Sequence, residues 1–300
     1  MALRIGEYVK LARPFTLLAP ALGMVSAGVA GLGALPAGDR PTLIAVRLIA
    51  GAALAVALNA ASNALNQICD LEIDRINKPG RPLPSGALSV RAAWVFTAVF
   101  FAVTLGIAAV LGRDVLIVVA GGSAAVAAYS IPPLRTKRFP FLSNLTIAAA
   151  RGLLLPVAGW AVINTIDKPE AWFLGAIGFF FILGAASTKD FKDVEGDRAG
   201  GVTTLPIKYG AKAAAWMVAP SLVLPFLLMP LGAHLGVLTG RPTVLAVGGI
   251  VLALWGVYVA FLILRRPDDL GRIENHPSWL HMYLIMLGQQ AVVMASYWPA

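Results

Sequence analysis

Charged residues and cysteines are both scarce in this 300-residue chain. Only 13% of the residues are charged, whereas 58% are hydrophobic, and a single water-soluble domain of this length cannot bury so many apolar side chains. The single cysteine, Cys69, excludes an intrachain disulfide and a cysteine-rich zinc site. The three histidines are too scattered along the sequence to form a metal site. Most of the chain is therefore expected to lie in lipid.

Long apolar runs recur along the whole chain. About 20 apolar residues suffice for a helix to cross the roughly 30 Å hydrocarbon core of a bilayer. The runs lack the alternation of a barrel strand. We therefore predict an all-α integral membrane protein, one domain over residues 1–300, with nine transmembrane helices around a central cavity that faces the cytoplasm. The nine predicted spans are 17–35, 43–68, 92–111, 115–131, 142–163, 171–188, 213–238, 244–264 and 279–298.

Positive charge is distributed unevenly between the two predicted membrane faces. The N-terminal segment and the loops after spans two, four, six and eight share one face and carry 18 of the 24 Lys and Arg residues. Cytoplasmic loops are rich in these residues, so the N-terminus is predicted to be cytoplasmic. The net charge of +9 then reflects topology and contact with anionic lipid, and no nucleic-acid-binding motif accompanies it. Since no organelle-targeting extension precedes the first span, we expect a prokaryotic plasma membrane.

Two polar stretches, 70–91 and 189–212, contain nearly the same sequence. The first opens with Asp-Leu-Glu-Ile-Asp-Arg at Asp70, and the second contains Asp-Val-Glu-Gly-Asp-Arg from Asp193, 123 residues later. Each stretch follows an even-numbered predicted span and leads to a Leu-Pro step and a glycine. This pattern predicts a parallel internal duplication, with a site between the two halves at the cytoplasmic face.

Oxygen-bearing side chains recur at helical spacing near both stretches. Residues three or four apart share one face of a helix, and two sets have this spacing: Asn66, Asp70 and Asp74, and then Asp190, Asp193 and Asp197. Carboxylates at this spacing repel one another unless a cation intervenes. Mg²⁺ prefers oxygen ligands and is commonly held by one or two carboxylates together with phosphate oxygens. The two sets predict a two-metal clamp, and the alternative is that these acids only solvate helix ends.

Basic residues accompany both sets of acids. An isoprenoid diphosphate suits such a site, because metal ions and basic side chains stabilise the departing diphosphate, while the prenyl chain is as apolar as lipid. An aromatic face from Tyr129, or from a residue of the run 179–181, is expected to stabilise the cation left on the isoprenoid carbon. The candidate diphosphate-binding residues are Arg75, Lys78, Arg81, Arg135, Lys137, Lys189, Lys192 and Arg198. All of them also lie in loops where cytoplasmic topology alone places basic residues.

These stretches resemble the two Asp-rich motifs of the UbiA superfamily of intramembrane prenyltransferases. The first reads Asn-Gln-Ile-Cys-Asp-Leu-Glu-Ile-Asp-Arg from Asn66, and the second reads Lys-Asp-Phe-Lys-Asp-Val-Glu-Gly-Asp-Arg from Lys189. Tyr-Ser-Ile-Pro-Pro-Leu-Arg-Thr-Lys-Arg from Tyr129 is similar to the loop after the fourth helix of that family. The resemblance covers essentially the whole chain. It implies Mg²⁺-dependent transfer of a prenyl group from a polyprenyl diphosphate, such as geranylgeranyl diphosphate, to a hydrophobic or aromatic acceptor.

The resemblance also implies roles for individual residues. Catalytic roles are expected for Asp70, Asp74, Asp193 and Asp197. Two Mg²⁺ ions are expected, with the ligands Asn66, Asp70, Asp74, Asp190, Asp193 and Asp197. Substrate contacts are expected from Arg75, Arg81, Tyr129, Arg135, Lys137, Lys189 and Arg198.

The acceptor is left open by the sequence. The Ile-Asn-Lys-Pro segment from Ile76 is more similar to the chlorophyll synthase, homogentisate prenyltransferase and digeranylgeranylglyceryl phosphate synthase branches than to the 4-hydroxybenzoate branch. An intramembrane terpenoid cyclase on the same scaffold is an alternative, because it needs the same ionisation step. A secondary transporter is another, although its ion ligands are expected near mid-membrane. A membrane phosphotransferase is disfavoured, because its Asp-Gly-x-x-Ala-Arg element is absent.

Overall fold

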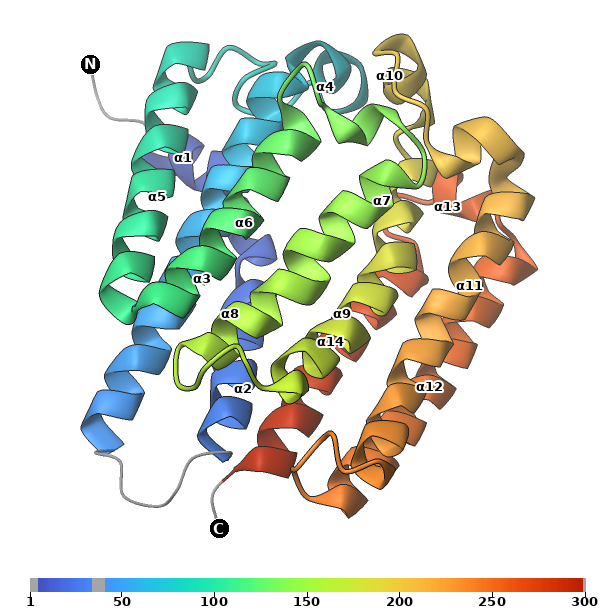
Figure 1. Ribbon diagram of the computed structural model, residues 1–300. Coiled ribbons are helices and arrows are strands. Elements are labelled where there is room, and N and C mark those ends of the chain that lie inside the picture. The colour runs from blue at the N-terminus through green and yellow to red at the C-terminus, as the bar shows by residue number, and fades with distance from the viewer. Residues whose placement is uncertain (1–4, 34–40, 299–300) are drawn as a thin grey trace.

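The computed structural model describes residues 5–33 and 41–298, and within these ranges the chain forms helices and contains no strand (Figure 1). The predicted all-α fold class is thus confirmed for the described residues. The end of the first predicted span, at residue 35, and two basic residues of the charge analysis, Arg4 and Arg40, lie outside them.

The described residues form α-helices joined by short loops and by tighter or wider helical turns. The α-helices are α1 (Ile5–Ala12), α2 (Leu18–Gly33), α3 (Pro41–Cys69), α4 (Leu71–Asn77), α5 (Val90–Leu111), α6 (Arg113–Ser130), α7 (Leu142–Ile147), α8 (Leu155–Ala161), α9 (Pro169–Ala185), α10 (Val194–Ala199), α11 (Leu205–His234), α12 (Pro242–Arg265), α13 (Asp269–Arg272) and α14 (Pro277–Tyr297). The 3₁₀ segments are η1 (Pro14–Thr16), η2 (Thr136–Arg138) and η4 (Ala186–Phe191), and η3 (Ala148–Leu154) is a π-helix that joins α7 to α8.

Seven helical stretches of the described chain are long and apolar enough to cross a membrane, and the count rises to eight if one bent pair is taken as a single span. The bent pair comprises residues 5–16 and 18–33, whose axes differ by 51°. The ninth predicted span corresponds to α14, which carries His281, Gln289 and Gln290 and does not belong to the apolar set. The prediction of nine spans is therefore not confirmed.

Small residues let several helices approach one another closely. A Cβ atom on Gly256 of α12 would lie 1.9 Å from the main-chain oxygen of Leu222 in α11. A Cβ atom on Gly178 of α9 would lie 2.5 Å from the main-chain oxygen of Gly152 in η3. Small residues of this kind are typical of helix contacts in membranes, where van der Waals packing provides much of the attraction.

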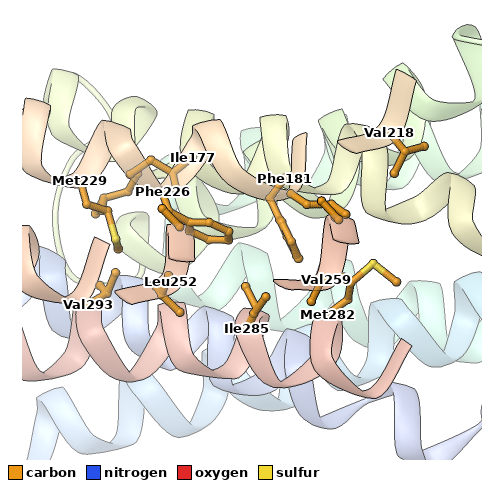
Figure 2. Close-up of a cluster of buried hydrophobic side chains, with 14 of the residues drawn as sticks. Ile177, Phe181, Val218, Phe226, Met229, Leu252, Val259, Met282, Ile285 and Val293 are labelled. Atoms are coloured by element: carbon orange, nitrogen blue, oxygen red, sulfur yellow. The ribbon is translucent and has the colours of Figure 1, made fainter. Parts of the chain in front are cut away.

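Among the described residues, the most extensive apolar core lies mainly among the C-terminal helices. The rings of Phe181 on α9 and Phe226 on α11 have their centroids 5.3 Å apart. Figure 2 shows these rings directed toward side chains of the facing helices, among them Leu252 and Ile285. Close packing on this side gives α9 a fixed position, and η4 with the second Asp-rich motif follows directly from α9.

The two short helices α4 and α10 lie together at one end of the bundle (Figure 1). Each follows a long helical stretch: α4 continues from α3, and α10 continues from α9 through η4. The helix α14 ends at the opposite end of the bundle (Figure 1). Residues 123 positions apart in sequence are thereby brought to the same end.

Candidate active site

The two Asp-rich motifs adopt the same local structure. Asp70 lies at the break between α3 and α4, and Asp193 lies at the break between η4 and α10. Each occupies the N-cap position of its short helix, and the backbone N–H groups of Asp74 and Asp197 donate to the carbonyl oxygens of Asp70 and Asp193, at 2.7 and 3.0 Å. Both Asp74 and Asp197 are buried. Four-residue spacing thus puts each pair on one helical face.

Asn77 joins the two motifs. Its side-chain amide donates to the carbonyl oxygen of Asp193 at 3.1 Å, and its amide oxygen accepts from the backbone N–H of Gly196 at 3.0 Å. A Cβ atom on Gly196 would lie 2.5 Å from the Asn77 side chain, so only glycine permits this contact. The same junction contains an ion pair in which Lys78 donates to both oxygens of Asp193 at 2.6 Å.

The other acids of the first motif are also paired with basic side chains. Arg81 donates to the Asp74 carboxylate at 2.5 Å. Asp70 pairs with Lys137, which is only 7% exposed, and with Arg135 at 3.4 Å. Both Lys137 and Arg135 come from the loop after α6, so three separate segments meet at this cluster. In the described residues, four of the predicted basic side chains therefore contact predicted metal ligands.

Burial makes the negative charge of these acids costly. It raises the pKa of Asp197 to about 6, against the opposing effect of the Lys137 ammonium group. Burial also raises the pKa of Asp74, against the opposing charge of Arg81. Asp190, in η4, is likewise buried. Carboxylates in such surroundings favour bound cations, because a nearby positive charge offsets their loss of hydration.

Asn66 connects the acid cluster to a cavity. It lies in the last turn of α3, and its amide group donates to a carboxylate oxygen of Asp70 at 2.6 Å. The cavity has a volume of about 420 Å³ and is lined by residues of several helices. Apolar side chains such as Leu174 and Phe181 form much of its wall, and Tyr129 and Lys189 also line it. The Lys189 ammonium nitrogen lies 5.9 Å from the centre of the Tyr129 ring.

Some predicted residues lie away from this cluster. Arg75 is exposed and donates to the Glu72 carboxylate at 2.7 Å. Arg198 is exposed on α10 and forms no ion pair with any described residue. Of the predicted aromatic run, Phe181 lines the cavity, whereas Phe179 and Phe180 pack edge to face with centroids 5.3 Å apart.

Two arginines that the sequence did not place in the site also line the cavity. Arg13 precedes η1 with a left-handed backbone (φ 57°), and Arg151 lies in the π-helical segment η3. A signal for Arg151 was present in the sequence, because it is an arginine inside a predicted span and such residues are commonly functional. Nothing comparable marks Arg13, whose position depends on the turn before η1.

Within the described ranges, no three His, Cys, Asp or Glu side chains form a ready-made metal cage. The oxygen donors are instead divided between the two motifs, around the helix breaks at Asp70 and Asp193. Sparse carboxylate sets are compatible with Mg²⁺, which commonly retains waters and takes phosphate oxygens as further ligands.

Comparison with known proteins identifies relatives along most of the chain. The sequence pattern of the UbiA prenyltransferase family matches residues 18–276. Digeranylgeranylglyceryl phosphate synthase of Thermococcus gammatolerans is 32% identical over 271 residues, 89% of this chain and 90% of that protein. The bacteriochlorophyll synthase 34 kDa chain of Chloroflexus aurantiacus is 32% identical over 284 residues, 93% of this chain and 85% of that protein.

A solved structure shares the fold. A UbiA homolog from Archaeoglobus fulgidus, bound to GPP and Mg²⁺, matches 96% of this chain and 99% of its own length with a TM-score of 0.70 and 20% sequence identity. At 20% sequence identity, this structural similarity shows that the two proteins share the same arrangement of helices.

Proposed function

Because the chain belongs to the UbiA prenyltransferase family, we propose that it transfers a prenyl group from a polyprenyl diphosphate to a lipid or aromatic acceptor in a Mg²⁺-dependent reaction. The predictions of this family and of a prenyltransferase are confirmed by the relatives. One observation supports transfer from a prenyl diphosphate: the two Asp-rich motifs contact each other beside an apolar cavity. A prenyl diphosphate has a polar head and an apolar chain, so it needs a polar site and an apolar cavity next to each other.

The donor set fits two Mg²⁺ ions. We assign the ligands to two sets around the helix breaks at Asp70 and Asp193: Asn66, Asp70 and Asp74 form one set, and Asp190, Asp193 and Asp197 form the other. Four of the carboxylates, those of Asp70, Asp74, Asp190 and Asp197, are buried, and burial supports a bound cation because it disfavours their negative charge in isolation. When bound, Mg²⁺ supplies positive charge that stabilises the diphosphate as its bond to the prenyl carbon breaks.

The paired basic side chains are the proposed diphosphate ligands. Lys78, Arg81, Arg135 and Lys137 each contact a carboxylate of the two motifs. With Mg²⁺ held by those carboxylates, the basic groups would be free to donate to diphosphate oxygens instead. This exchange of partners keeps the charges compensated, which the buried pair of Asp70 and Lys137 requires. Lys189 is a further candidate because it lines the cavity beside Tyr129.

The cavity is the proposed binding site for the prenyl chain. Its apolar wall excludes water from the reacting carbon, so a prenyl cation survives long enough to meet the acceptor. Tyr129 presents an aromatic ring in the same cavity, and an aromatic face attracts a cation. We propose that the chain of geranylgeranyl diphosphate, or of a similar donor, lies along this wall.

The orientation of the chain in the membrane follows from its basic loops. The residues of the site lie in or beside segments that carry most of the Lys and Arg residues, and such segments face the cytoplasm. We propose a cytoplasmic active site in a prokaryotic plasma membrane, with the cavity opening on that side. The matching breaks at Asp70 and Asp193 support the predicted internal duplication.

Release of diphosphate from geranylgeranyl diphosphate tests the proposal. The purified full-length chain in detergent is assayed with and without Mg²⁺, while aromatic and lipid acceptors are screened for prenylated products by mass spectrometry. We expect Mg²⁺-dependent release together with one prenylated product. Release with a cyclised hydrocarbon and no adduct would favour the cyclase, and no release from donors of any chain length would refute the proposal.

A further inference from the structure

Arg151 places a positive charge inside a membrane-crossing stretch. It lies in residues 142–161, which are apolar enough to span a membrane, and its side chain lines the cavity. Among the residues that the structure describes, no carboxylate lies within 4.0 Å of its guanidinium group. Three described residues, Arg13, Lys189 and Tyr129, interact with it electrostatically, and the first two of them are cations. Since arginine stays protonated when buried, an anion is needed to compensate it.

The backbone around Arg151 has an unusual conformation. Residues Ala148–Leu154 form a π-helix, and π-helical turns are rare and often lie at functional sites. The neighbouring Gly152 crosses Gly178 of α9 at van der Waals contact, where a Cβ atom on Gly178 would lie 2.5 Å from the Gly152 oxygen. This crossing fixes η3 against α9 and holds Arg151 at the cavity wall.

Apart from Lys189, the proposed diphosphate ligands do not line the cavity wall that holds Arg151. The basic residues beside the Asp-rich motifs, among them Arg81 and Lys137, already contact carboxylates there and lie outside the long apolar helices. Arg151 instead lies between Ile147 and Leu155, which also line the cavity and offer only apolar surface. The prenyl chain that we place in the cavity carries no charge. The second substrate is then the remaining candidate for the compensating anion.

We propose that Arg151 binds an anionic oxygen group, a carboxylate or a phosphate, on the prenyl acceptor. This inference rests on the proposed function. In the transfer, the bond between the prenyl carbon and the diphosphate oxygen breaks, and diphosphate leaves with the electron pair. A nucleophilic atom of the acceptor bonds to that carbon, and the acceptor loses one proton. Arg151 takes no part in the proton transfer: its planar guanidinium matches the geometry of either anion and so orients the acceptor.

Paired acceptors with and without the charge provide the test. The full-length chain is assayed with geranylgeranyl diphosphate and two pairs: homogentisate with its methyl ester, and a glycerol-phosphate ether lipid with its dephosphorylated alcohol. For the charged acceptor that the wild type uses, Arg151→Gln is expected to raise KM about 10- to 100-fold, and Arg151→Lys less. A raised KM for homogentisate would identify the bound group as a carboxylate, and a raised KM for the glycerol-phosphate lipid would identify it as a phosphate. The KM for the donor and the release of diphosphate without acceptor are expected to remain unchanged.

Arg113→Gln, at the exposed start of α6, is the matched control and should leave every constant unchanged. A raised donor KM or a loss of acceptor-free diphosphate release in Arg151→Gln would overturn the inference and place Arg151 in the diphosphate site. Equal losses with the charged and neutral acceptors, or use of neutral acceptors alone by the wild type, would also overturn it. If the wild type released no diphosphate with Mg²⁺, the proposed function itself would fail.

Discussion

Lys78 donates hydrogen bonds of 2.6 Å to both carboxylate oxygens of Asp193, although 115 positions separate the two residues. Lys78 follows the first Asp-rich motif, and Asp193 belongs to the second. Asn77 strengthens the same junction through its contacts with Asp193 and Gly196. The two motifs thus form one continuous polar surface, and a change in either is expected to affect a shared ligand.

Replacing a single acid in either Asp-rich motif should nearly abolish the release of diphosphate. We expect Asp70→Ala and Asp193→Ala to slow Mg²⁺-dependent release by about 100-fold or more, because each loses charge that holds the metal. For Asp193→Ala, the thermal stability should change by less than about 1 kcal/mol, since its pair with Lys78 is partly exposed. Glu72→Ala is the control, because Glu72 is exposed and pairs with Arg75. Full activity in Asp193→Ala would contradict the ligand assignment.

Lys137 should contribute mainly to donor binding. It is buried against Asp70 and lies in electrostatic range of Asp197, between the two motifs. We expect Lys137→Ala to raise the KM for the prenyl diphosphate about tenfold, the effect of losing one charged hydrogen bond. The adjacent Arg138→Ala should leave KM unchanged, because Arg138 is exposed and its guanidinium stacks on Phe139. An unaltered KM in Lys137→Ala would show that Lys137 pairs with Asp70 for structural reasons only and does not bind the donor.

Spacing along the helix explains which site residues the sequence predicted well. Asp70 and Asp74 share a face because they are four apart, and the same holds for Asp193 and Asp197. Residues at adjacent positions do not share a face, so Arg75 points away from Asp74 and reaches Glu72 instead. Sequence proximity to a motif was therefore a poor guide to contact.

Contacts between distant segments could not be predicted from the sequence. Arg13 reaches the cavity only through the left-handed turn before η1, which leaves no periodic signal. The role of the polar residues of α14 could not be predicted from the sequence either. Gln289 and Gln290 line the cavity, and they make this helix less apolar than the sequence-based count of spans assumed. Long apolar runs predicted the helices, whereas the polar wall of the cavity required the assembled bundle.

Two arginines next to the motifs provide a direct comparison of sequence position with structural position. Arg75→Ala and Arg198→Ala are expected to change the donor KM by less than about twofold, because exposed substitutions away from specific contacts usually have small effects. Arg81→Ala should raise KM far more, since Arg81 contacts Asp74 directly. The three variants are compared in one steady-state assay. Equal effects in all three would show that proximity to the motif decides the role after all.

Arg47 should stabilise the bundle without affecting the reaction. Its guanidinium donates to the main-chain oxygen of Val162 at 2.6 Å and to that of Leu111 at 2.8 Å, at the ends of α8 and α5. Helix ends carry unpaired carbonyl groups, and lipid offers them no donor. We expect Arg47→Met to lower the free energy of unfolding by about 2–3 kcal/mol, with both KM values unchanged. Thermal unfolding in detergent measures the first quantity, and an unaltered stability would contradict the role.

The crossing of Gly152 and Gly178 links the stability of the bundle to the position of Arg151. In Gly178→Ala the added methyl group would lie 2.5 Å from the Gly152 oxygen, so η3 and α9 must move apart. Overpacking of this kind costs about 1–3 kcal/mol, and the displacement of η3 should also raise the acceptor KM. Gly122→Ala in α6 is the matched control, because a Cβ atom there meets nothing within 4 Å and alanine favours the helix. A Gly178→Ala variant with wild-type stability and acceptor KM would show that the crossing does not hold Arg151 in place. If Gly178→Ala lost stability but kept its acceptor KM, the contact between Gly152 and Gly178 would stabilise the bundle without positioning Arg151.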